Sequence, residues 1–94
     1  KCKDIDKLAR GYINSHELGQ YFVHGLGHSL GLEIHENPRF NQSSKDILEV
    51  GDIMTVEPGI YLPGDFGVRI EDMILITEGG FENMTKAPKD LIVI

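Results

Sequence analysis

The chain has 94 residues, with 9 Lys and Arg against 15 Asp and Glu, and a net charge of −6 at pH 7. This length allows one domain at most, or part of one. The acidic balance argues against a nucleic-acid partner or a polybasic membrane anchor, both of which require a cationic face, and no stretch reaches the ~18 apolar residues of a membrane span. The single cysteine, Cys2, excludes an internal disulfide and favours a reducing, cytoplasmic location.

The first predicted element is a helix over residues 4–14. Its apolar residues recur every three or four positions and form one stripe: Ile5, Leu8, Ala9, Tyr12 and Ile13. Asp4 is suited to cap the first turn, and Asn14 to end the helix. We expect this stripe to pack on the rest of the chain.

Residues 15–37 are predicted to form a loop rich in glycine and histidine. Four glycines interrupt any regular helix there, and all the histidines of the chain lie in the same region: His16, His24, His28 and His35. Glycine lets the backbone approach another group closely. A polar loop is expected to follow over residues 38–46.

From residue 47 the pattern predicts short strands. Runs of β-prone residues alternate with Pro-Gly and Gly-Gly turns. The predicted strands cover residues 53–56, 60–62, 67–77, 81–85 and 91–94. One helix, a glycine-histidine loop and a mostly antiparallel sheet define an α+β fold.

The histidines are the first candidates for a functional site. His24 and His28 stand four residues apart among glycines, and His35 follows seven residues later. Imidazole binds divalent transition metals and transfers protons near neutral pH. A single histidine is more often a surface or packing residue, but three within twelve residues favour a functional site.

Two carboxylates could extend this site. Glu57 follows the predicted strand 53–56 at the start of a turn, where it is either solvated or directed into a site, and Glu71 shares a strand face with Arg69. A structural Arg69–Glu71 pair is the alternative interpretation of the second carboxylate. One imidazole with two carboxylates suits Mn, Zn, Fe or Co, and such a metal would activate water against a carbonyl or phosphoryl group.

Three motifs together resemble a known family. They are H-G-L-G-H-S-L-G-L-E-I-H-E-N-P at 24–38, T-V-E-P-G-I-Y at 55–61 and G-V-R-I-E-D at 67–72. In this order and at this separation they resemble the proline-specific metallopeptidases of the pita-bread fold, which include prolidases and Xaa-Pro aminopeptidases. The sequence R-I-E-D at 69–72 differs from the Q-x-E-H-T typical of methionine aminopeptidases, which favours the proline-specific branch.

The resemblance implies a centre with two divalent metal ions. His28 and Glu57 would bind one ion, and Glu71 would bridge both. Arg69 would hold the metal-bound carboxylates in place. Manganese is the first choice of metal, with cobalt, zinc or iron as alternatives.

The resemblance also implies a substrate. His35 would contact the carbonyl of the bond that is cut, and His24 would line the pocket on its proline side. The implied reaction is metal-dependent hydrolysis of an Xaa-Pro bond in a dipeptide or a longer peptide.

The family uses five protein ligands, and this chain matches three of them. The two aspartates that precede the histidine in the family have no counterpart here. Residues 1–94 are therefore expected to be the C-terminal part of a catalytic domain without its upstream half, and to be inactive when isolated. The open sheet edge predicts self-association or pairing with the missing half.

Two other functions fit the resemblance less well. A non-catalytic interaction module on the same scaffold would have no need of His28, Glu57 and Glu71. A creatinase-like hydrolase works without metal and would not need them either. The presence of all three residues favours the metal-dependent enzyme.

Overall fold

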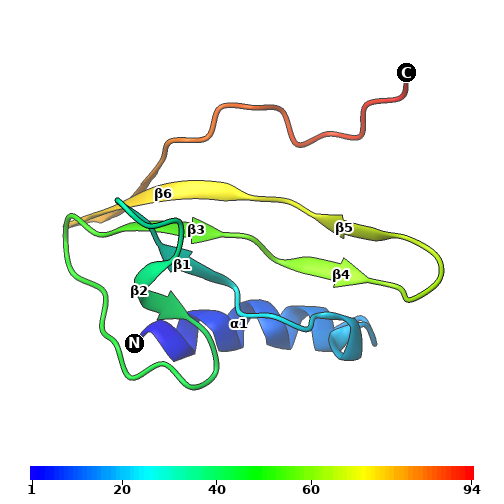
Figure 1. The fold of residues 1–94 in the computed structure, drawn as a ribbon, viewed down its shortest axis with the longest axis horizontal. Helices are drawn as coiled ribbons and strands as arrows, with labels where there is room; N and C mark the ends of the chain where they lie inside the picture. Colours follow the sequence, from blue (N-terminus) through cyan, green and yellow to red (C-terminus); the bar gives the residue numbers. More distant parts are fainter.

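The computed structural model describes all residues, 1–94, and combines one helix with an antiparallel sheet (Figure 1). The helix α1 (Cys2–Ser15) precedes a short 3-10 turn, η1 (Gly19–Tyr21), and seven strands. The strands are β1 (Gly27–Ser29), β2 (Glu36–Phe40), β3 (Ile53–Val56), β4 (Gly59–Tyr61), β5 (Gly67–Arg69), β6 (Asp72–Thr77) and β7 (Gly80–Asn83). Five of them form one sheet in the order β2-β1-β3-β6-β7, and β4 pairs with β5. All pairs are antiparallel, which confirms the predicted α+β fold.

The core lies between α1 and the face of the sheet that it covers. Its buried apolar residues are Cys2, Ile13, Phe22, Leu26, Phe40, Met54 and Ile74. Met54 of β3 and Ile74 of β6 stand opposite each other in register. Because side chains alternate along a strand, the neighbouring positions Thr55 and Met73 are directed to the other face of the sheet, away from α1.

The helix buries only part of the predicted stripe: Ile13 is buried, and Ile5 and Ala9 pack against the core. Its buried residues are Cys2, Asp6 and Ile13, whereas Leu8 and Tyr12 are 76% and 70% exposed. The Asp6 carboxylate takes an inner position because it is hydrogen-bonded there, accepting from the Leu26 N–H and from Arg10. No helix of the structure is long and apolar enough to cross a bilayer.

The predicted glycine-histidine loop contains a strand. His28 lies in β1, between β2 and β3, and β2 begins at Glu36. Gly27 permits this arrangement, because a Cβ at its position would lie 1.8 Å from the carbonyl oxygen of Thr55. Only glycine lets β1 approach β3 so closely.

The strand predicted for residues 91–94 is wrong. These residues are exposed and make no backbone hydrogen bond. A strand requires a partner edge, which an apolar, β-prone sequence does not supply by itself. The chain after β7 instead runs back past β6 and β5 at the top of Figure 1, and Lys89 Nζ lies 2.8 Å from Asp72 Oδ1.

Replacing Lys89 by methionine is expected to lower stability near neutral pH only. The hydrogen bond from Lys89 holds the pKa of the Asp72 carboxyl below its usual value of 3.8. A carboxyl whose pKa falls on folding stabilises the protein above its unfolded-state pKa, and the effect is lost as the pH drops through the folded-state value. We expect the free energy of unfolding to fall by about 0.5–1 kcal/mol at pH 6, as for other partly exposed ion pairs. This difference should shrink as the pH falls below 3.8.

Urea unfolding at several pH values measures this difference. Lys86→Met is the matched control, because Lys86 Nζ donates only to the backbone carbonyl of Asn83. A deficit in Lys89→Met that stays constant from pH 6 into the acid range would contradict the ion-pair explanation.

Candidate metal centre

His28 lies in the middle of β1, and its ring is held on one side. Its Nδ1 lies 2.8 Å from the carbonyl oxygen of Ser29, and its backbone N–H donates to Thr55 Oγ1 at 3.0 Å. Because a carbonyl oxygen only accepts hydrogen bonds, Nδ1 carries the hydrogen, and Nε2 is left to bind a cation. Histidines that bind metal ions commonly donate their other ring N–H to a carbonyl in this way.

Glu57 places a carboxylate next to Nε2 of His28. It follows β3 directly, and its backbone N–H donates to the carbonyl oxygen of Leu26 at 2.7 Å. Its Oε2 lies 3.3 Å from His28 Nε2, and both side chains are largely buried. Two ligand atoms about 2.1 Å from a shared metal ion are about 3.0–3.4 Å apart. The separation of this pair therefore suits two neighbouring positions around one ion.

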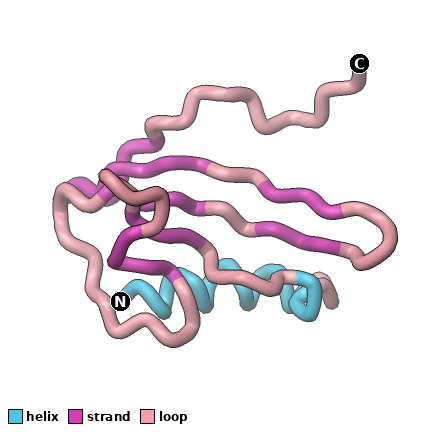
Figure 2. The backbone as a smooth tube through the Cα atoms, in the orientation of Figure 1, coloured by secondary structure: helices cyan, strands magenta, loops and turns pink.

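Glu71 lies opposite Glu57, in the short segment between β5 and β6. Figure 2 shows β3 and β4, and likewise β5 and β6, as two long runs that are each interrupted by a short loop segment. The two pairs of strands share one register, and between them Ile70 N–H donates to the Pro58 carbonyl oxygen at 3.3 Å. The same register puts Glu71 directly opposite Glu57, where Cβ atoms are typically about 5 Å apart. Like charges in this position repel each other unless a cation lies nearby.

Arg69 contacts a tyrosine instead of a carboxylate. Its Nη1 donates to Tyr61 Oη at 3.3 Å, and it forms no ion pair. This hydrogen bond raises the pKa of the Arg69 guanidinium above its usual value, and the charges of Glu57 and Glu71 add smaller contributions. Arg69 therefore does not make the predicted direct contact with Glu57 or Glu71, but interacts with them only through its charge.

His24 and His35 border the same concavity as His28. His24 Nε2 lies 2.8 Å from Tyr61 Oη, and its Nδ1 lies 2.7 Å from the Gly25 carbonyl oxygen. The ring of His35 stands at 64° to that of His28, with centroids 4.4 Å apart. The concavity has a volume of about 190 Å³ and is lined by His24, Gly25, Gly27, His28, His35, Arg39, Asn41 and Glu57. Three histidines and one carboxylate singled out in the sequence therefore meet at one place.

These residues alone do not enclose a metal ion. No group of three His, Cys, Asp or Glu side chains is close enough to hold one. His28 and Glu57 form a pair, Glu71 lies between β5 and β6, and the Asp72 carboxylate is paired with Lys89. The imidazole and carboxylate donors fit a divalent ion such as Mn, Fe, Co or Zn.

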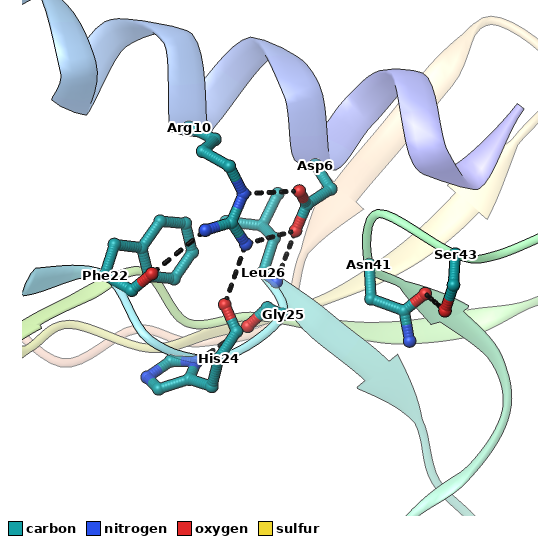
Figure 3. Close-up of polar contacts among 8 residues, drawn as sticks. All are labelled: Asp6, Arg10, Phe22, His24, Gly25, Leu26, Asn41 and Ser43. Carbon is teal, nitrogen blue, oxygen red and sulfur yellow. Dashed lines mark hydrogen bonds and ion pairs between the residues drawn. The ribbon is translucent and has the colours of Figure 1, made fainter. Parts of the chain in front are cut away.

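Sequence reasoning missed three residues that support this site. Tyr61 connects His24 to Arg69, and Asp6 and Arg10 of α1 hold the backbone that carries His24 (Figure 3). The spacing of Asp6 and Arg10 is that of an ion pair within one helix, which the sequence could have indicated. No local pattern indicates the contacts of Tyr61, because its partners are distant in sequence.

The fold and the paired imidazole and carboxylate are compatible with a metal-dependent hydrolase, and a comparison with family models identifies the family. Residues 1–78 match the model of metallopeptidase family M24. The chain therefore belongs to this family, which confirms the resemblance inferred from the motifs and implies the use of divalent metal ions.

Particular members of the family are similar over nearly all of the chain. It is 49% identical over 91 residues to the Xaa-Pro dipeptidase of Pyrococcus furiosus, a match that covers 97% of this chain and 26% of the relative. The structure of an Xaa-Pro dipeptidase from Bacillus anthracis superposes with a TM-score of 0.96 at 50% identity, covering 99% of this chain and 26% of that one. The structure of an X-Pro aminopeptidase from Thermotoga maritima superposes with a TM-score of 0.94 at 41% identity. This match covers 99% of this chain and 26% of that one. The chain thus spans about a quarter of the length of these relatives.

Proposed function

We propose that this chain is part of a longer, metal-dependent peptidase that hydrolyses Xaa-Pro bonds. The observation that carries the proposal is the approach of His28 Nε2 to Glu57 Oε2 at 3.3 Å, beside His35 in one polar concavity. The similarity to a protein named Xaa-Pro dipeptidase supports the choice of substrate. A cytoplasmic location is proposed from the single cysteine.

In this proposal His28 and Glu57 would hold one of two divalent metal ions, and Glu71 would be a ligand shared by both. The position of Glu71 opposite Glu57 supports a bridging role, since a shared cation relieves their repulsion. The bound ions would activate a water molecule and polarise the substrate carbonyl. Manganese is the first candidate, with cobalt, zinc and iron as alternatives.

The remaining side chains would orient the substrate. His35, next to the His28 ring, would donate a hydrogen bond to the carbonyl oxygen as negative charge develops on it. His24 would line the proline side, with its ring fixed by Tyr61. Arg69 would act on the carboxylates through its charge while it holds Tyr61.

We further propose that residues 1–94 are the C-terminal part of the catalytic domain, and that an upstream part supplies two aspartate ligands. The coverage of 26% of a relative's length and the lack of a three-ligand group within this chain support this division. We call the longer protein that contains residues 1–94 the complete protein.

The direct test is hydrolysis by the complete protein with Mn²⁺. We expect release of proline from Ala-Pro and no release of alanine from Ala-Ala, with activity lost on chelation and restored by Mn²⁺. Ala-Pro-Gly in a parallel assay distinguishes an aminopeptidase, which would cut it, from a strict dipeptidase. Hydrolysis that survives exhaustive chelation would support the creatinase-like alternative, and no hydrolysis with any metal would support a non-catalytic module.

A further inference from the structure

Asp6 and Arg10 form a buried ion pair on the inner side of α1, one helical turn apart (Figure 3). Arg10 Nε lies 3.0 Å from Asp6 Oδ2, and Arg10 Nη2 lies 3.2 Å from Asp6 Oδ1. The Asp6 side chain is fully buried, and that of Arg10 is 17% exposed. This two-point contact holds the guanidinium in one orientation. We call these two residues the clasp.

The other hydrogen bonds of the clasp all go to the backbone of residues 22–26. Arg10 Nη1 donates to the Phe22 carbonyl oxygen and Arg10 Nη2 to that of His24, each at 2.9 Å. The Leu26 N–H donates to Asp6 Oδ1 at 3.0 Å. The Arg10 guanidinium also lies over the Phe22 ring, 4.3 Å from its centre. Figure 3 shows these contacts converging from α1 on the histidine-bearing segment.

Residues 22–26 make few other backbone hydrogen bonds, although the side chains of Phe22 and Leu26 are buried in the core. They lie outside every helix and strand, and their remaining backbone bonds are Phe22 N–H to the Gly19 carbonyl and Glu57 N–H to the Leu26 carbonyl. The hydrogen bond from Arg10 is therefore the only one made to the backbone of His24. The segment leads directly into β1, so its position also determines where His28 enters the sheet.

We propose that Asp6 and Arg10 are positioning residues that fix His24 and the entry of β1, and so set the geometry of the metal centre. Buried ion pairs add little net stability compared with apolar side chains of similar size, whereas a planar guanidinium bound at four points specifies geometry closely. The inference rests on the proposed function for its effect on catalysis, but its structural part can be measured without turnover.

Arg10→Lys in the complete protein tests the proposal. Lysine keeps the charge beside Asp6 but cannot hold the carboxylate and both carbonyl oxygens in one plane. We expect kcat for Ala-Pro to fall about 10–100-fold with KM changed less than about twofold, because groups that orient a metal ligand have effects of this size. The affinity for Mn²⁺, measured by calorimetry, should weaken by about tenfold.

The ring of His24 gives a signature that a general loss of stability would not produce. The Gly25 carbonyl requires the hydrogen on Nδ1, with Nε2 directed to Tyr61. ¹⁵N NMR of the imidazoles should show this single tautomer in the wild type, and broadened or shifted His24 signals in Arg10→Lys. Ile13→Val is the matched control, because it shortens a buried side chain of the same helix and removes no hydrogen bond to residues 22–26. It should leave kcat and the His24 signals unchanged.

A second variant keeps the test decisive if Arg10→Lys folds poorly. Arg10→Ala leaves a space that free guanidinium can enter, so about 20 mM guanidinium should restore kcat at least fivefold, whereas NaCl at equal ionic strength should not.

Wild-type kcat and His24 signals in Arg10→Lys would overturn the proposal, as would an equal loss of kcat in Ile13→Val. A wild-type protein that cuts no Xaa-Pro bond would contradict the proposed function instead, and the NMR comparison would still test the clasp.

Discussion

Replacing His28 by alanine in the complete protein is expected to lower kcat/KM for Ala-Pro by more than 100-fold and to remove one bound metal ion. Loss of a group that only orients a metal ligand lowers metal affinity or activity about 10–100-fold. His28 is itself the proposed ligand, so its loss should have a larger effect. Its Nε2 is the only ring atom free to bind, since Nδ1 is engaged by the Ser29 carbonyl. Glu57→Gln should have a similar effect, because Gln supplies no negative charge next to His28.

Metal content by elemental analysis, together with kcat and KM, checks this expectation. His16→Ala is the matched control, since His16 lies at the end of α1, packs on Tyr12 with ring centroids 4.9 Å apart and does not line the concavity. It should keep wild-type activity and metal content. A His28→Ala protein with two bound ions and normal turnover would contradict the assigned ligand.

The histidine site shows what a sequence can predict. His24, His28 and His35 are close in the chain, so their meeting in one concavity follows from a short, glycine-rich segment. Glu57 is 29 positions from His28, and no local rule brings the two together. Their approach depends on the pairing of β1 with β3, which Gly27 makes possible. The family motifs imply this long-range contact, because the resemblance assigns His28 and Glu57 to the same metal ion.

The two wrong predictions, the exposed part of the helix stripe and the strand at 91–94, have a common physical cause. The predicted helix stripe included Leu8 and Tyr12 because apolar side chains were assumed to face inward, but Asp6 is buried through its hydrogen bonds. The predicted strand at 91–94 is apolar and β-prone but has no partner edge. In both cases the outcome depends on a partner distant in sequence, and local periodicity contains no information about that partner.

The role of Arg69 illustrates the same limit within the site. Alternation along a continuous strand predicted that Arg69 and Glu71 lie on one face, and the motif implied that Arg69 holds the carboxylates. The strand is interrupted at Ile70 and Glu71, and Arg69 reaches Tyr61 across the β4–β5 pair. This strand break of two residues has no clear signal in the sequence.

The isolated 94-residue chain is expected to bind at most one Mn²⁺, weakly, and to release no proline from Gly-Pro or Ala-Pro. It contains no group of three ligands, and only His28 and Glu57 are in direct contact. The chain should also self-associate, because an apolar cavity of about 560 Å³ opens between α1 and the outer part of the sheet. Its apolar lining is Ile5, Phe40, Leu48, Val56, Ile74, Ile76 and Phe81.

Calorimetric titration of Mn²⁺ into the purified chain, with His28→Ala alongside, measures the stoichiometry, and sedimentation measures the association state. One weak site that disappears in His28→Ala is the expected result, since a second ion would leave Glu71 as its only ligand from this chain. Two ions per chain, with turnover of Ala-Pro above the His28→Ala background, would contradict the expectation. That outcome would mean that a second copy supplies the missing carboxylates, so that the working site is built between chains and not by an upstream half of the same chain.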